Sequence, residues 1–116
     1  MPKYAALIYR VEADQAAQHS PESRQQYQAW GSFNQDVARA GVLSHGTGLQ
    51  PTTTATSVRV REGKTLITDG PFAETREQLG GILLFDCNDL DDAIQWASRV
   101  PDALTGCIEL RPVWEA

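Results

Sequence analysis

The segment from Lys3 to Val11 constrains the fold most, because it is apolar on both sides of a predicted strand. With the two-residue period of a β-strand, the two faces carry Tyr4, Ala6 and Ile8 on one side and Ala5, Leu7, Tyr9 and Val11 on the other. A strand with one solvated face instead alternates apolar and polar residues. The segment therefore predicts a central strand in a sheet whose two faces are both at least partly covered.

Two helices are predicted to cover one face of this sheet. The first begins at Ser20 and Pro21, a hydroxyl N-cap followed by proline at the first helical position, and ends at Gly41. The second begins at Asp89 and ends before Pro101. Apolar residues recur at helical spacing in each: Trp30, Phe33, Val37 and Ala40, then Leu90, Ala93, Ile94 and Ala97.

The remaining segments predict five strands, two of which are joined by a tight turn at Glu62-Gly63-Lys64. The strands are Val42 to Leu49, Ser57 to Arg61, Thr65 to Thr68 and Ile82 to Cys87, and a last one lies near Cys107 to Val113. Two of them form a hairpin, and without it the order is β-α-β-β-α-β, the split arrangement of the ferredoxin-like α+β fold. With both helices on one face, the apolar side chains of the other face need a cover, and pairing with a second copy supplies it. A homodimer is therefore expected.

Size and charge limit the class of protein. At 116 residues the chain fits one domain, residues 1–116, with no room for a separate cofactor domain. A net charge of −5 without a basic patch argues against direct nucleic-acid binding. No stretch is as long as a membrane span, and the N-terminus lacks a signal-peptide pattern, so we expect a cytoplasmic protein.

The sequence predicts neither a metal site nor a cofactor. Cys87 and Cys107 have no Cys-x-x-Cys spacing, and the two histidines lie in different segments. The two cysteines are therefore interpreted as small buried hydrophobic residues in a reducing compartment. His19 precedes the first helix, where we expect it in solvent, and it is given no role.

Asp69 is the leading candidate for chemistry. It lies at a predicted strand end before Gly70 and Pro71, which fix the backbone and can hold a carboxylate at the mouth of a cavity. The same three residues are also explained without a ligand, because Asp before Gly often caps its own turn. His45, in the second strand, is a proton shuttle if it faces the same cavity, and otherwise a hydrogen-bonded strand residue.

Four further residues are candidates for ligand binding. Glu77 can supply a second carboxylate, and Arg76 can neutralise an anionic ligand, although a polar run of this kind usually forms a solvated loop with local pairs. Arg111 shares one face of the last strand with Glu109, where the two can pair across the sheet or a dimer interface. Tyr9 can direct its hydroxyl into a cavity or belong to the core.

The stretch from Val58 to Gly81 reads VRVREGKTLITDGPFAETREQLGG, flanked by Gly48 to Pro51 and by Glu109 to Pro112. It resembles the signature of the YCII-related proteins of the Asp-Gly-Pro-Phe (DGPF) subgroup. The resemblance implies a dimeric α+β barrel in which two ferredoxin-like sheets pack face to face. Members of the subgroup are often encoded beside extracytoplasmic-function sigma factors, which makes a sigma factor a candidate partner by association.

The resemblance also tests one mechanism. Some relatives in the wider YCII group carry a His near the start of the first helix and an Asp before the Pro that closes the second, a proposed acid/base dyad, and one branch removes halide from a chlorinated hydroquinone. Here these positions hold Ser23 and Val100, so that assignment is not carried over.

Three function hypotheses stay open, one of which is the interaction with a sigma factor named above. The first is a small dimeric module that binds an unknown small molecule or has a regulatory role. The alternative is a cofactor-free enzyme that uses Asp69, with His45 or Glu77, on a small polar or aromatic substrate.

Overall fold

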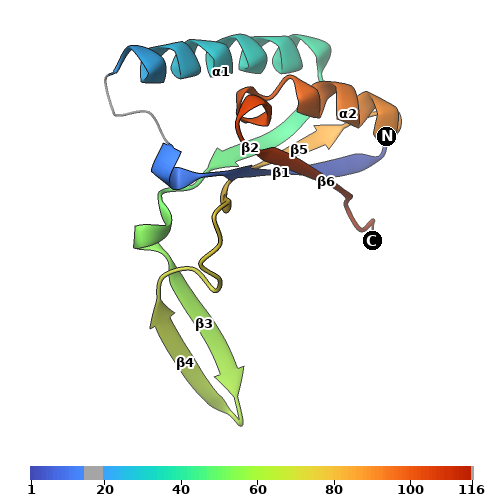
Figure 1. Ribbon diagram of the computed structural model, residues 1–116. Coiled ribbons are helices and arrows are strands. Elements are labelled where there is room, and N and C mark those ends of the chain that lie inside the picture. The colour runs from blue at the N-terminus through green and yellow to red at the C-terminus, as the bar shows by residue number, and fades with distance from the viewer. Residues whose placement is uncertain (15–19, 116) are drawn as a thin grey trace.

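The computed structural model describes residues 1–14 and 20–115, so His19 lies outside the described residues. The chain forms a four-stranded sheet, two helices on one of its faces, and a hairpin that projects away from both (Figure 1). The strands are β1 (Lys3–Arg10), β2 (Leu43–Gly48), β3 (Thr56–Arg61), β4 (Lys64–Asp69), β5 (Gln78–Asp86) and β6 (Cys107–Pro112). The helices are α1 (Pro21–Ala40) and α2 (Leu90–Ser98), with short 3-10 turns η1 (Glu12–Asp14), η2 (Thr52–Thr54) and η3 (Pro101–Leu104).

The strand order is β2-β5-β1-β6, and all neighbours are antiparallel. With the hairpin set aside, the element order and this strand order confirm the predicted ferredoxin-like α+β fold, with β1 in the interior of the sheet. Strand β5 begins at Gln78 rather than at Ile82. Leu79 pairs with Tyr9 and Gly81 with Ile8, which leaves Gly80 as the extra residue of a β-bulge.

Helix α1 begins and ends as predicted. The Ser20 side chain accepts a hydrogen bond from the Ser23 amide (3.1 Å), and Gly41 closes the helix at φ 69°, the left-handed conformation that favours glycine. Phe33 and Val37 are buried, whereas Ala40 is exposed at the end of the helix.

Helix α2 begins at its predicted cap, where Asp89 accepts a hydrogen bond from the Asp92 amide (2.8 Å). Its buried face differs from the predicted stripe. Ala93 and Ala97 are buried as expected, but Leu90 and Ile94 are about half exposed. The two alanines face the core, and the bulk on this side comes instead from Trp96, which packs against the core, and from buried Val100.

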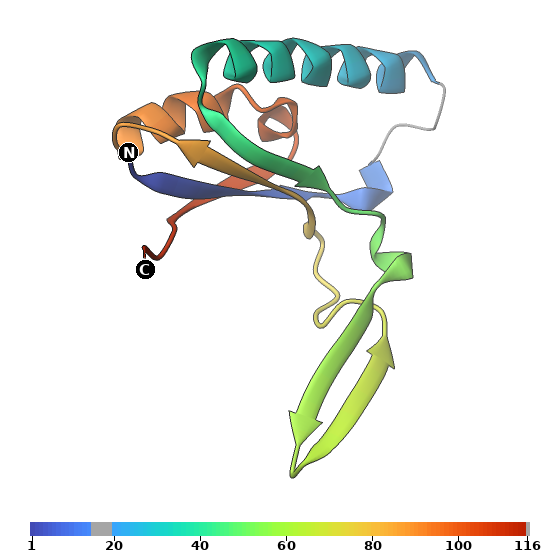
Figure 2. The same ribbon diagram turned by 180° about the vertical axis from the view of Figure 1, so that it is seen from behind.

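The core lies between the helices and the sheet. Its members are Tyr4, Ala6, Ile8, Phe33, Val37, Val42, Leu83, Phe85, Cys87, Ala93, Ala97 and Val100. The opposite face, called the open face below, carries Ala5, Leu7, Tyr9, Ile82 and Leu84 without a helix over it (Figures 1 and 2). These five are only partly buried, as the pattern of the first strand indicated.

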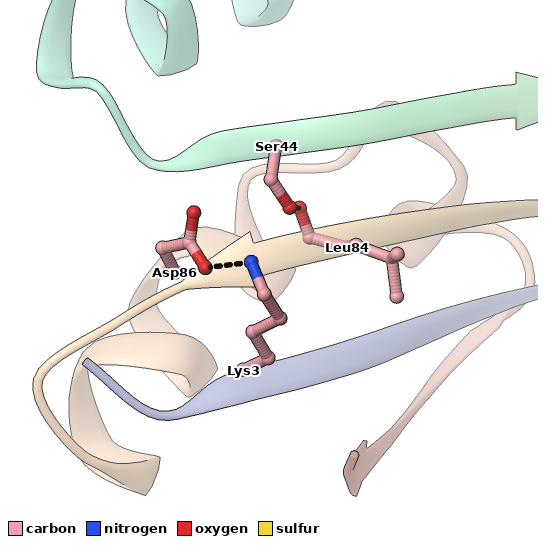
Figure 3. A network of polar contacts seen from close by, with 4 residues as sticks. All are labelled: Lys3, Ser44, Leu84 and Asp86. Carbon is pink, nitrogen blue, oxygen red and sulfur yellow. Dashed lines mark hydrogen bonds and ion pairs between the residues drawn. The ribbon is translucent and has the colours of Figure 1, made fainter. Parts of the chain in front are cut away.

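Two polar contacts join neighbouring strands at one end of the sheet (Figure 3). Lys3 Nζ lies 2.6 Å from Asp86 Oδ1, joining β1 to β5. The Ser44 hydroxyl donates a hydrogen bond to the Leu84 carbonyl (3.1 Å), at a point where the pairing of β2 with β5 shifts register. The side chain thus supplies a contact where the backbone ladder is interrupted.

The hairpin β3–β4 projects from the sheet as a separate arm (Figure 2). Its turn has Glu62 at φ 52° and Gly63 at φ 75°, the left-handed pair that suits a tight hairpin and confirms the predicted turn. At its root, the Glu12 carboxylate accepts hydrogen bonds from the Thr52 amide (2.8 Å) and hydroxyl (2.6 Å). These contacts attach the arm to the segment that follows β1.

The loop before β6 gives a test of the fold. A methyl group added at Gly106 would lie 2.1 Å from the Tyr9 carbonyl oxygen, so we expect Gly106→Ala to destabilise the protein by about 3 kcal/mol. Gly31→Ala in α1 meets nothing within 4 Å and should stabilise by about 0.5 kcal/mol. Urea unfolding of both variants measures the difference, and equal stabilities would contradict the close approach.

Candidate functional site

A cavity of about 390 Å³ lies between α1 and the sheet, and is called the α1 cavity below. This volume is within the range of small-molecule sites. Its lining residues come from both layers: Ile8, Arg10, Trp30, Asn34, Leu43, Gly46, Thr47, Gly48, Gly80, Gly81 and Leu83. Most are apolar or glycine, and Arg10 is the charged member of the set.

Glycines line this cavity on the side of the sheet. Gly46 and Gly48 alternate along β2, and Gly48 pairs with Gly81 across to β5. The Leu83 side chain occupies the space beside Gly46, whereas Gly48 keeps its space free. Trp30 and Asn34 of α1, one turn apart, line the cavity from the helix layer. A methyl group added at Gly48 would meet nothing within 4 Å, so the strand keeps free space at that position.

Arg10 reaches the cavity from the end of β1. Residues alternate along this strand, so Arg10 follows buried Ile8 on the face that the helices cover. Its side chain is 23% exposed and passes over Gly80, where an added methyl group would lie 2.7 Å from Nε. The bulge glycine therefore makes room for the guanidinium.

Asp102 pairs with Arg10 without lining the cavity itself, and Gln26 contacts Asp102. Asp102, in η3, is 2% exposed and is the buried charged residue of the described chain, with Oδ2 at 2.6 Å from Arg10 Nη2. The distance makes this an ion pair, although the direction of Oδ2 falls outside that of a hydrogen bond. Gln26 of α1 donates to Asp102 Oδ1 (3.0 Å). Three separate elements thus converge on one carboxylate.

Part of the guanidinium remains available. A guanidinium carries five N–H donors, and the Arg10 side chain is 23% exposed, although its Nε is buried. Because Asp102 does not line the cavity, a ligand there meets the Arg10 side of the pair. The arrangement can bind an acceptor group at one end and an apolar body along the rest of the cavity.

Asp69 and His45 lie elsewhere. Asp69 ends β4 on the arm and His45 lies in β2 on the open face, where it pairs with Leu84; both are exposed. Neither lines the α1 cavity nor two further cavities of about 510 and 590 Å³ near the root of the arm. Their use as an acid/base pair stays a prediction.

The other predicted residues lie around the root of the arm and on the open face. Tyr9 and Glu77 line the cavity of about 590 Å³, and Arg76 lines the one of about 510 Å³. Arg111 Nε donates to Glu109 Oε2 (2.9 Å), so these two residues pair along one strand face. Burial, and then the contact of the hydroxyl with Glu109, raises the pKa of Tyr9.

The two cysteines differ. Cys87 is buried, and burial raises the pKa of its thiol to about 11, whereas Cys107 is exposed on β6. The prediction that both are buried is thus correct for Cys87 and wrong for Cys107, which pairs with Tyr9 on the open face.

Among residues 1–14 and 20–115, no three His, Cys, Asp or Glu side chains gather as a metal site would require. None of the described helices is long and apolar enough to span a membrane.

The positions of the relatives' dyad have structural roles here. Ser23 lies in the first turn of α1, where its hydroxyl donates to the Ser20 carbonyl (3.0 Å), and Val100 is buried in the core. The polar pair that does meet, Gln26 and Asp102, lies close beyond these positions in the sequence. Sequence reasoning missed it, although one signal was available, because Arg10 continues the strand face of Tyr4, Ala6 and Ile8.

Fold and cavity together define a small α+β protein with a ligand-sized space between its helices and its sheet. The YCII-related domain model matches residues 2–116. An uncharacterized protein of Rhizobium meliloti (strain 1021) is 38% identical over 112 residues, which cover 95% of this chain and 90% of that protein. The chain therefore belongs to the YCII-related family.

The buried pair can be tested by a mutant cycle. Asp102→Leu leaves Arg10 without its partner, and we expect a loss of about 3 kcal/mol in the free energy of unfolding. The double variant Arg10→Met/Asp102→Leu removes both charges and should recover most of this loss. Asp36→Ala, which breaks an exposed pair with Arg99, should cost less than about 1 kcal/mol. A double variant no more stable than Asp102→Leu alone would contradict the pairing.

Proposed function

We propose that the protein is a small-molecule-binding module whose ligand occupies the α1 cavity. One observation carries this proposal: a charged side chain, Arg10, lines a mostly apolar cavity and is held there by a nearly fully buried carboxylate. Burying an ion pair gains little net stability over apolar packing, so the pair is better explained by what it presents to the cavity.

The acid/base enzyme is the weaker alternative. It needs Asp69 to meet His45 or Glu77 at one cavity, and Asp69 lines none of the three described above. Catalysis without a cofactor requires a base within hydrogen-bond reach of its substrate. The geometry therefore favours a binding role with Arg10 over a catalytic role with Asp69.

Filling the cavity tests the binding role. Gly48→Leu adds a side chain where the strand has free space, so we expect a folded protein that no longer binds fragments in the cavity. The screen measures the rise in melting temperature with a fragment library, since ligand at about 100 times its Kd stabilises by ~2.7 kcal/mol.

The matched control is Gly31→Leu, the same substitution at an exposed position of α1 with free space around it. It should keep every fragment that stabilises the wild type. Fragments that stabilise Gly48→Leu as strongly as the wild type do not bind in the α1 cavity, and this result would overturn the proposal.

We also propose that the open face pairs with a second copy. Leu7, Ile82 and Leu84 are only partly buried there, and the arm exposes Val58 and Ile67 by 62% and 68%. A two-stranded hairpin is marginally stable alone in water, so the arm gains from a neighbouring surface.

Mass measurement tests this pairing. Light scattering should give twice the 12.7 kDa of one chain, and Leu84→Glu should give a monomer because it places a charge on the open face. Leu104→Glu is the control, because Leu104 is 89% exposed in η3 and away from the open face. A monomeric wild type, or a dimeric Leu84→Glu variant, would rule out this interface.

Three finer assignments belong to the proposal as well. They are membership of the DGPF subgroup, which rests on the stretch from Val58 to Gly81, a cytoplasmic location, and a sigma factor as partner. The sigma-factor link is an association through neighbouring genes of similar proteins, and a pull-down from the native host that recovers no sigma factor would count against it.

A further inference from the structure

We infer that the ligand of the α1 cavity is a small, flat organic acid with a single negative charge, bound through its carboxylate by Arg10. This inference rests on the proposed binding function and names the class of ligand. Three features of the cavity carry it: the unused donors of Arg10, the charge of Asp102 behind it, and the shape set by Trp30 and the glycines.

The donors of Arg10 select an acceptor. A guanidinium is a planar fork that matches a carboxylate through two parallel hydrogen bonds. Asp102 lies 2.6 Å from Nη2 and Nε is buried, so the donors that a ligand can reach are those of the Nη atoms. A carboxylate accepts charge-assisted hydrogen bonds from such donors. A neutral carbonyl accepts them without that charge assistance, and a cationic group does not accept them.

The charge of Asp102 limits the ligand to a single charge. The Arg10–Asp102 pair is neutral as a whole, so the cavity offers directed donors without a large positive potential. A phosphate dianion would bring two negative charges into a mostly apolar space beside a buried carboxylate, in a protein of net charge −5. A carboxylate forms the same paired hydrogen bonds with half that charge.

The walls of the cavity favour a flat body. Trp30 lines it from α1, and Gly46, Gly48 and Gly81 line it from the sheet without side chains. Trp30 on the helix side and the free space at Gly48 on the sheet side leave room for a ring, and aromatic rings pair with offset or edge contacts to an aromatic side chain. Ile8, Leu43 and Leu83 add apolar surface around it. An aromatic monocarboxylate fits a cavity that has room for a flat ring beside the guanidinium of Arg10.

Asp102 acts as a positioning residue. It does not line the cavity, and it holds Nη2 of Arg10 while Gln26 holds its other oxygen. Its second effect is to offset the guanidinium charge. Asp102→Asn should therefore shift the preference of the cavity toward doubly charged ligands, which a merely structural loss would not do.

Four probes of similar size test the inference: benzoate, benzamide, cyclohexanecarboxylate and phenyl phosphate. Kd is measured by amide chemical-shift titration of the full chain. Benzoate should bind at least tenfold more tightly than benzamide, which lacks the charge, and more tightly than cyclohexanecarboxylate, which is not flat, and phenyl phosphate, which carries two charges.

Variants then assign the contact. Arg10→Gln should reduce the affinity for benzoate to that for benzamide, and Arg10→Lys should restore part of it, because a lysine keeps the charge without the fork. Asp102→Asn should narrow the ratio of benzoate to phenyl phosphate affinity at least threefold. The affinities are measured on the folded fraction of each variant. Arg10→Gln tests the inference even if Asp102→Asn fails to fold.

The outcomes separate this inference from the binding function. Neutral fragments that bind the wild type but not Gly48→Leu, without any preference for benzoate, would overturn the acid ligand and leave the binding function intact. No binding by any probe or fragment would overturn both. A tenfold preference for benzoate that survives in Arg10→Gln would also overturn the role given to Arg10.

Discussion

The burial of Asp102 is the constraint on which the candidate site depends. A carboxylate that is 2% exposed requires a cation and hydrogen-bond donors, and Arg10 and Gln26 supply them from β1 and α1. The contact therefore ties the end of a central strand, a helix and η3 to one point. It also turns a charged side chain toward the layer that otherwise holds the apolar core, beside a cavity that the chain leaves open.

The architecture could be predicted from the sequence because local signals agreed with one another. The apolar first strand, the Ser20 and Asp89 caps and the turn at Gly63 each matched the structure. Strand β5 was predicted too short, since Gln78, Gly80 and Gly81 near its start are weak strand formers, and Gln78 and Leu79 join the sheet by pairing with Arg10 and Tyr9. That pairing is a tertiary effect, which local propensity does not report.

The site was harder to predict for a physical reason. Asp69 attracts attention because a rigid turn surrounds it, but a rigid turn indicates local conformation and not a cavity. Arg10 and Asp102 lie far apart in the sequence, and they form an ion pair only because the fold brings β1 and η3 together. Likewise, the glycines of β2 and β5 read as weak strand residues until α1 lies over them.

The glycines have an energetic consequence as well. Where glycines line the cavity, its wall is backbone without rotamers, and its shape there is fixed by the ladder of hydrogen bonds between β2 and β5. A ligand that contacts this part of the wall orders no side chain there, which spares part of the conformational entropy that ordering flexible side chains costs on binding. The entropic cost of binding therefore falls on the ligand and on the side chains that also line the cavity, Trp30 and Arg10 among them.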